Sequence, residues 1–223
     1  MPVLITALVY LCLAAAVLAV RGKPAYPAAK ALAGAGFCAL ALVCALRPGG
    51  SPWPMPLPAA FALCAAGDVA MGLYNLHRRA RALRWGGVLF AAGHLCFIAG
   101  LWRRTRPTLW CFVFALLAAA LLALALRRGL LDMGRLGGMG VGYCFAVSLM
   151  AAQGTALALH APRPGTLLFA AGGVLFWASD LILLGLYFSR KKGSAALHVA
   201  NLASYYAGML LMALSMGAAA PLS

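Results

Sequence analysis

Acidic residues are nearly absent from this chain of 223 residues. It contains no glutamate and three aspartates, Asp68, Asp132 and Asp180, against 18 lysines and arginines. Charged residues of both signs make up only 9% of the sequence, whereas 65% is hydrophobic, and the mean hydropathy is +0.96. A soluble fold has no means of burying that much apolar surface, so the composition excludes a water-soluble globular protein and predicts a membrane protein.

The positive charge has a simpler explanation than nucleic acid. A net charge of +15 would favour nucleic-acid binding in a soluble protein. Here the lysines and arginines stand in short clusters between long apolar runs, as is typical of loops that face anionic lipid headgroups. We therefore expect membrane lipid as a partner and no nucleic acid.

Metal-binding and nucleophile motifs are also lacking. The seven cysteines lie inside apolar runs, without a CxxC pair or a Cys/His ligand pattern, and should pack as small hydrophobic side chains. No stretch resembles the GxSxG elbow of serine hydrolases. We predict no metal and no cofactor.

Eight stretches are long and apolar enough to cross a bilayer. We expect these spans at residues 2–20, 27–46, 57–76, 85–102, 108–126, 137–159, 166–189 and 195–217. The first has no basic segment ahead of it, which favours a transmembrane helix over a signal peptide. The connections are short, so the sequence predicts an all-α polytopic membrane protein, with residues 1–223 forming a single integral membrane domain.

Lysine and arginine are unevenly distributed over the connections. Twelve lie in the first, third, fifth and seventh loops and five in the other three, with Lys30 inside a span. The positive-inside rule therefore predicts that both termini lie on the non-cytoplasmic side, in the inner membrane if the chain is bacterial. Four tryptophans at span ends are typical of an aromatic belt: Trp53, Trp85, Trp102 and Trp110.

Two segments of the sequence resemble each other. "CAAGDVAMGLYNLHRRA" and "FWASDLILLGLYFSRKKG" each place a small residue before an aspartate, then an apolar stretch, Gly-Leu-Tyr and a basic loop. The aspartates, Asp68 and Asp180, are 112 positions apart, which is half the chain. We interpret this as two parallel four-helix repeats related by an axis along the membrane normal. Chance similarity among apolar helices is the alternative.

Asp68, Asp180 and His94 share one depth in the membrane. Each lies nine or ten residues from the basic end of its span, which corresponds to about 14 Å at 1.5 Å per residue. A charge at the bilayer centre costs from about 2.5 to above 10 kcal/mol, so such groups normally face a bundle interior or a wet cavity. We expect all three to line one cavity that opens toward the cytoplasmic half. For any one of them, a helix-packing hydrogen bond is the alternative.

Other polar side chains lie close to this plane. Tyr143, Tyr205 and Tyr206 fall within a turn or two of it, as does Lys30. The ammonium group of Lys30 has the alternative of snorkelling to the interface. Asp132, which is flanked by arginines, is expected to be a solvated loop charge.

Two buried carboxyls and a histidine suit acid and base chemistry. A carboxyl among apolar groups can keep its proton and act as a general acid, while a better solvated one stays charged and stabilises a cation or activates water. This division suits reactions with an oxocarbenium-like transition state. The sequence leaves open which aspartate takes which role.

Several strings resemble, in order and spacing, the YhhN or lysoplasmalogenase family of eight-span membrane proteins. They are "KALAGAGF", "AAGDVAMGL", "LFAAGHLCFIAGL", "YCFAVSLMAAQGTAL", "GGVLFWASDLILLGLYF" and "LASYYAGMLLMAL". The most specific parts are Gly67-Asp68, Gly93-His94, Ser179-Asp180 and Tyr205-Tyr206. The chain departs from the family pattern at Ala31, where proline is usual, and at Gly208, where glutamine is usual.

The resemblance implies an enzyme that hydrolyses the vinyl ether bond of a lysoplasmalogen to a fatty aldehyde and a glycerophospho-alcohol. It implies Asp68, Asp180 and His94 as catalytic residues and a lysophospholipid as the substrate. The expected substrate-binding residues are Tyr205, Tyr206, Tyr143, Lys30 and Ser179. The alternative is a proton-coupled transporter of lipids or small molecules, since intramembrane Asp and His residues also form proton relays.

Overall fold

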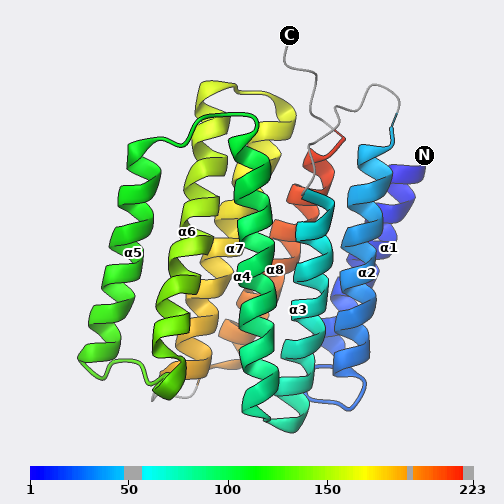
Figure 1. Cartoon of the computed structure of the whole chain (residues 1–223). Coiled ribbons are helices and arrows are strands. Elements are labelled where there is room, and N and C mark those ends of the chain that lie inside the picture. The colour runs from blue at the N-terminus through cyan, green and yellow to red at the C-terminus, as the bar shows by residue number, and fades with distance from the viewer. Residues whose placement is uncertain (48–56, 190–192, 218–223) are drawn as a thin grey trace.

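The computed structural model describes residues 1–47, 57–189 and 193–217, and these form a bundle of long helices (Figure 1). Eight of the helices are long and apolar enough to cross a membrane, which confirms the all-α, eight-span prediction. They are α1 (Pro2–Ala19), α2 (Tyr26–Ala45), α3 (Leu57–His77), α4 (Ala80–Trp102), α5 (Leu109–Arg127), α6 (Gly137–His160), α7 (Pro164–Phe188) and α8 (Ala195–Ser215), with a 3-10 turn, η1 (Gly134–Leu136), before α6.

One helix starts well before its predicted span. α4 begins at Ala80 rather than at residue 85, because arginine is a good helix former and the helix continues through Arg81 and Arg84. The turn from α3 needs only two residues, Arg78 with φ 53° and Arg79 in an extended conformation. Two of the charges expected in a loop therefore lie on the first turns of a helix.

The outer surface of the bundle is apolar, as a lipid-facing surface must be. Exposed leucines line the outer helices, including Leu4 and Leu8 on α1 and Leu117 and Leu121 on α5. Trp85, Trp102 and Trp110 are also exposed at helix ends, which agrees with the predicted aromatic belt. The protein is an integral membrane protein. Four residues used in predicting the belt and the basic loops, namely Trp53, Arg190, Lys191 and Lys192, lie outside the described part of the chain.

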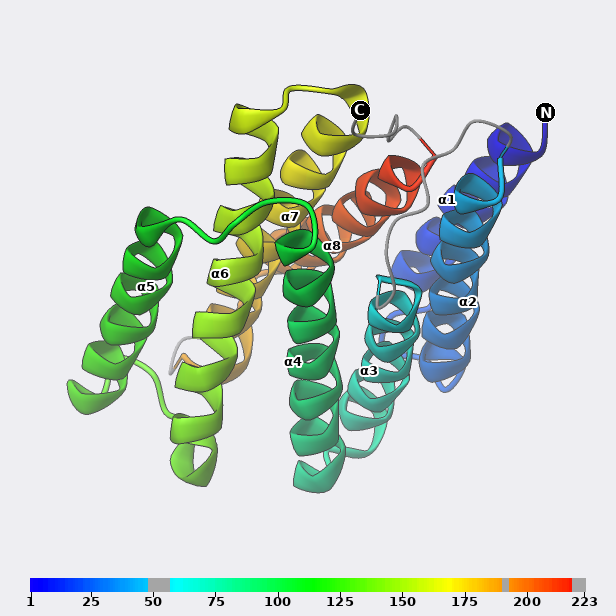
Figure 2. The same ribbon diagram turned by 45° about the horizontal axis from the view of Figure 1, so that its top comes forward.

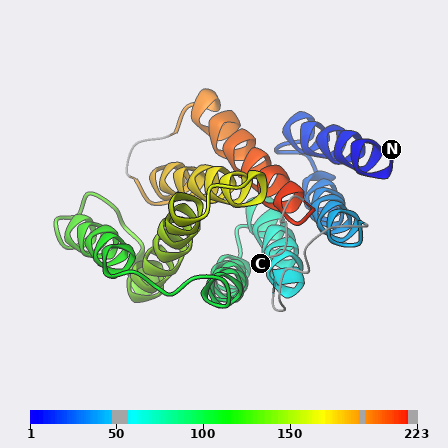
Figure 3. The same ribbon diagram turned by 90° about the horizontal axis from the view of Figure 1, so that it is seen from above.

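The two halves of the chain pack in the same way. Successive helices are neighbours from α1 to α4 and again from α5 to α8. Between the halves, α2 packs on α8 and α4 packs on α6, and exchanging the halves converts one pair into the other. α1 and α5, the equivalent first helices, lie at opposite edges when the bundle is seen from above (Figure 3).

Glycine permits a close backbone contact between α7 and α8. A Cβ atom on Gly172 would lie 2.7 Å from the backbone oxygen of Gly208, and one on Gly208 would lie 2.8 Å from the oxygen of Gly172. Both distances are below any normal contact for a Cβ atom. Small residues of this kind let transmembrane helices approach through their backbones, so this pair fixes the position of α8 against the Asp180-bearing helix (Figure 2).

Candidate active site

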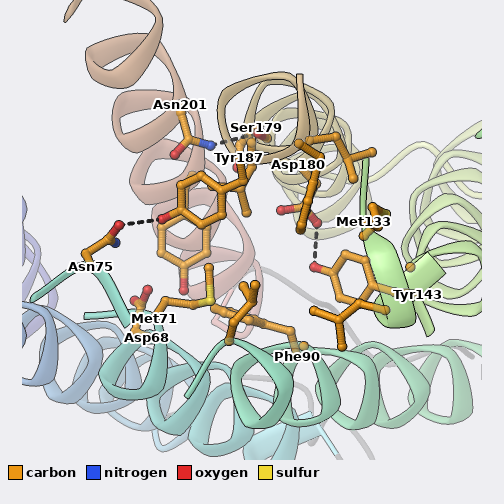
Figure 4. Close-up of a pocket in the computed structure, with 18 of the residues that line it drawn as sticks. Asp68, Met71, Asn75, Phe90, Met133, Tyr143, Ser179, Asp180, Tyr187 and Asn201 are labelled. Carbon is orange, nitrogen blue, oxygen red and sulfur yellow. Dashed lines mark hydrogen bonds between the residues drawn. The ribbon is translucent and has the colours of Figure 1, made fainter. Parts of the chain in front are cut away.

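A cavity of about 110 Å³ lies between the inner helices, in the half of the bundle where α1, α3, α5 and α7 end. We call this end of the bundle the basic end, because it is the end to which the sequence assigns most lysines and arginines. Aromatic and aliphatic side chains such as Phe90, Met71 and Leu183 make up most of the wall (Figure 4). Into this apolar space project two carboxyl groups, those of Asp68 and Asp180.

Asp68 on α3 is paired with a buried cation. The Nζ atom of Lys30 on α2 lies 2.5 Å from its Oδ1 atom, and the two side chains are 7% and 1% exposed, respectively. Three tyrosine rings surround the ammonium group, with centroids 5.9 Å (Tyr26), 5.6 Å (Tyr205) and 5.9 Å (Tyr206) away. Lys30 therefore points inward to the carboxylate and does not snorkel to the interface.

Asp180 on α7 has a different partner. The hydroxyl of Tyr143 on α6 donates a hydrogen bond of 2.6 Å to its Oδ2 atom. The Nε2 atom of His94 on α4 lies 3.2 Å from the same hydroxyl, so the three residues form a chain across three helices. The direct partner of Asp180 is thus a neutral phenol. No salt bridge to Asp180 is present among the described residues.

His94 is not in the cavity wall, contrary to the prediction that it lines the cavity with the two aspartates. Its side chain is fully buried behind Tyr143, with its ring against Phe176 at a centroid distance of 4.8 Å. The Tyr143 side chain, which contacts the His94 ring from α6, lines the cavity in place of the imidazole. In the part of the chain that the structure describes, the link between His94 and Asp180 runs through the Tyr143 hydroxyl.

Several buried polar atoms at the site have no hydrogen-bond partner within the described ranges. They are the Oδ2 atom of Asp68, the Nδ1 atom of His94 and the hydroxyl groups of Tyr205 and Tyr206. The Tyr205 and Tyr206 hydroxyl groups still lie close enough to the Asp68 carboxyl to interact with it. The Asp68 carboxyl therefore has two phenol groups as well as the Lys30 ammonium group beside it.

The remaining predicted residues divide between the wall and the layer behind it. Tyr205 and Ser179 line the cavity, and the backbone oxygen of Ser179 accepts a hydrogen bond of 2.7 Å from Asn201. Tyr206 lies behind the wall, where its backbone oxygen accepts a hydrogen bond from Tyr10. Gly208 is also outside the cavity and faces α7, so in this chain the position of the family glutamine serves helix packing.

Three polar residues of the wall are absent from the sequence prediction. Asn75, Tyr187 and Asn201 line the part of the cavity nearest the basic end (Figure 4). The repeated Gly-Leu-Tyr string was the available signal, since Tyr187 ends its second copy and Asn75 follows its first. Polar residues near span ends are common, so position alone did not distinguish them.

The chemistry of this site is that of two unlike carboxyl groups. Within the described part of the chain, no three His, Cys, Asp or Glu side chains are placed to hold a metal ion. The Asp68 carboxylate has a cation that balances its charge, whereas Asp180 is held by a phenol. A pair of carboxyls in unlike environments is the arrangement that separates an acid from a base.

Comparison with known proteins agrees with this architecture. The model of the YhhN family matches residues 27–216, a range that includes Lys30, both cavity aspartates, Tyr143 and His94. No curated protein and no solved structure matches the chain.

Proposed function

The chain belongs to the YhhN family, and from that premise we propose that it is a membrane hydrolase that cleaves the vinyl ether bond of lysoplasmalogen-like lysolipids. The products are a fatty aldehyde and a glycerophospho-alcohol. One observation carries the proposal: Asp68 and Asp180 line the same intramembrane cavity from opposite sides but have partners of different charge (Figure 4).

The partners assign the roles. A charged carboxylate in apolar surroundings needs a counter-charge. Lys30 supplies one to Asp68, which is therefore the carboxylate. No described residue supplies one to Asp180, which therefore holds a proton and acts as the acid. Tyr143 is a positioning residue that fixes one oxygen of Asp180, and His94 in turn orients the Tyr143 hydroxyl.

Protonation of carbon is the difficult step of vinyl ether hydrolysis. Asp180 gives its proton to the carbon β to the ether oxygen, which produces an oxocarbenium ion and the Asp180 carboxylate. Water then attacks the cationic carbon while the Asp68 carboxylate accepts a proton from it. Both carboxyl groups lie in low-dielectric surroundings, where a negative charge beside the cation is strongly stabilising.

The resulting hemiacetal collapses with the opposite proton transfers. Protonated Asp68 returns its proton to the leaving glycerol oxygen, and the Asp180 carboxylate takes the hydroxyl proton as the aldehyde forms. Both aspartates are then in their starting states and one water has been consumed. No cofactor is needed for this balance.

The apolar wall suits the fatty chain of a lysolipid, and the polar end of the cavity suits its glycerol. Asn75 and Tyr187 lie toward the basic end, which we assign to the cytoplasmic side on the distribution of positive charge, with both termini on the opposite side. The lipid would enter from the bilayer with its headgroup at that face.

The test is aldehyde release by the purified protein in detergent or nanodiscs. Lysoplasmalogen should yield fatty aldehyde, an ester-linked lysolipid of the same chain length should not be cleaved, and the Asp180→Asn protein should be inactive. If wild-type protein releases no aldehyde but conducts a proton flux in liposomes, the site belongs to a transporter instead.

A further inference from the structure

A second cavity, of about 160 Å³, adjoins the first at the basic end. The two share five lining residues, including Tyr26, Asn75 and Tyr187, so they lie on either side of the same side chains. Whereas the first cavity is mostly apolar, the second is lined by Arg21, Arg78 and His198, which come from the ends of α1 and α3 and the first turn of α8.

The cations of this second cavity have no acidic partner there. The chain has three aspartates in all, and none lines this cavity. Within the described ranges, neither Arg21 nor Arg78 forms a salt bridge. Two guanidinium groups and an imidazole that converge on one hollow without a carboxylate form a recognition site for an anion, and arginine in particular matches the geometry of phosphate oxygens.

Arg78 occupies a backbone position that favours glycine. Its φ angle of 53° places it in the left-handed region, where a residue with a Cβ atom is strained. The turn between α3 and α4 would be made more easily by glycine, yet it carries an arginine whose guanidinium lies over the Tyr74 ring, 5.6 Å from the centroid. Strained residues of this kind cluster where the side chain has a function.

The rise along α3 from Asp68 to the ring that the Arg78 guanidinium covers is close to the length of a glycerophospholipid headgroup. Tyr74, against which the Arg78 guanidinium lies, is six residues from Asp68 along α3, or about 9 Å at 1.5 Å per residue. In a lysoplasmalogen, seven covalent bonds separate the carbon that is protonated from the phosphorus, which is roughly 9 Å when extended. A lipid with its vinyl ether between the aspartates would therefore place its phosphate at the arginines.

We propose that Arg21, Arg78 and His198 form a binding site for the phosphate of the lysolipid headgroup, so that the enzyme selects phosphorylated substrates over neutral alkenylglycerols. The chemistry recognised is a phosphate ester, and its identification with the substrate's own headgroup rests on the proposed function. The site would hold the substrate at the depth at which the vinyl ether meets Asp180.

Binding of uncleavable ligands tests the site without requiring turnover. The probes are a saturated 1-O-alkyl lysophosphatidylethanolamine and the 1-O-alkylglycerol of the same chain length, each titrated into purified protein in nanodiscs. The wild-type protein should bind the phosphorylated probe at least about tenfold more tightly, the worth of a charge-assisted contact. This ratio should fall toward one in Arg78→Gly and Arg21→Gln.

Two features keep the test interpretable. Arg78→Gly relieves the left-handed strain, so the variant should fold, and its melting temperature verifies this. Arg81→Gln is the matched control, since Arg81 is an exposed arginine three residues away that lines neither cavity. An unchanged ratio in both cavity variants, or an equal fall in the Arg81 variant, would overturn the proposal.

Competition distinguishes the headgroup from soluble phosphate. Inorganic phosphate and glycerophosphoethanolamine should displace the phosphorylated probe only at far higher concentrations, because they lack the chain that fills the first cavity. Displacement by inorganic phosphate at the affinity of the lipid probe would assign the site to a free anion and overturn the headgroup assignment. If the variants lower the affinity ratio of the two probes while no vinyl ether is cleaved, the phosphate site stands and the proposed function fails. If aldehyde is released while the affinity ratio does not change in the variants, the proposed function stands and the phosphate site fails.

Discussion

Tyr187 donates a hydrogen bond of 2.9 Å to the side-chain oxygen of Asn75, and these residues are 112 positions apart, the separation of Asp68 and Asp180. Residues at equivalent places in the two halves of the chain thus touch each other in the cavity wall (Figure 4). Contact between equivalent residues is expected near a two-fold axis. Together with the matching α2–α8 and α4–α6 contacts between the halves, this hydrogen bond supports the predicted two-fold relation of the repeats.

The aspartates' partners follow the same relation but differ in chemistry. Lys30 on α2 pairs with Asp68 on α3, and Tyr143 on α6 pairs with Asp180 on α7, at sequence separations of 38 and 37. Positions that differ by one residue between the two halves therefore carry a cation and a phenol. This difference turns a symmetric frame into a site with one charged and one neutral carboxyl, which acid and base catalysis requires.

Replacing either aspartate by asparagine should remove activity without unfolding the protein. Asparagine keeps the shape of the side chain but has no acidic proton to give and is a poor acceptor of one. We expect kcat to fall by roughly 10²- to 10⁴-fold in Asp68→Asn and in Asp180→Asn. The double variant should be little worse than either, since groups that act on one transition state are non-additive. Aldehyde release measures the rates, and multiplication of the two single effects would contradict a shared step.

The sequence predicted the spans and the two aspartates because each depends on one strong effect. Apolar runs of this length rarely occur outside transmembrane helices. A carboxyl group within such a helix has a high free-energy cost and therefore normally has a function. The partner of each aspartate was harder to predict from the sequence. Lys30 lies close enough to a helix end to snorkel, and only the fold shows that it turns inward to Asp68.

Depth alone also misplaced one side chain. His94 does lie near Asp180, but residues on different helices differ in the direction they face, and Tyr143 lies between the imidazole and the cavity. Arg21 and His198 were assigned no role in the sequence because charged residues at span ends are ordinary features of membrane proteins. Their convergence on one cavity depends on how α1 and α8 pack.

Removing the cation of the Lys30–Asp68 pair should destabilise the protein more than removing the pair. Lys30→Met leaves a buried carboxylate without a counter-charge, at a cost of about 3–5 kcal/mol. Adding Asp68→Asn should restore much of this stability, because the uncompensated charge is gone, while activity remains lost. Thermal unfolding in detergent measures the change in stability, and aldehyde release measures the loss of activity. Equal melting temperatures for Lys30→Met and wild type would contradict a charged Asp68.

Tyr143→Phe should impair catalysis while leaving the cavity intact. The change removes the hydroxyl that holds Asp180 and, with it, the link to His94, at a cost of about 1–3 kcal/mol for a buried group left unpaired. We expect kcat to fall by roughly tenfold or more, with KM nearly unchanged. Because His94 acts only through this hydroxyl, His94→Phe in the Tyr143→Phe background should cause little further loss. A large additional loss would indicate that His94 contacts the substrate directly.

Gly208→Ala tests the assignment of this position to packing. Its Cβ atom would lie 2.8 Å from the Gly172 oxygen and 3.1 Å from the Phe176 nitrogen, so α8 must move away from α7. Overpacking of this kind costs about 1–3 kcal/mol. The melting temperature should fall, and the ratio of activities toward lysoplasmalogens with different headgroups should stay as in wild type. Altered headgroup selectivity with an unchanged melting temperature would place Gly208 in the substrate site instead.

The order of the proton transfers predicts where solvent hydrogen appears in the product. If Asp180 protonates the carbon β to the ether oxygen, turnover in D2O must place one deuterium on the carbon next to the aldehyde group, because the acid has exchanged with solvent. Trapping the aldehyde by rapid reduction, followed by mass spectrometry, measures the label before slow exchange at that carbon can add to it. Unlabelled aldehyde incubated with Asp180→Asn protein in D2O gives the background. In H2¹⁸O the oxygen label should appear in the aldehyde and not in the glycerophospho-alcohol, because water attacks the oxocarbenium carbon and the glycerol oxygen leaves. Oxygen label in the alcohol would mean that the glycerol C–O bond is the one broken, and the roles given to Asp68 and Asp180 would then be wrong.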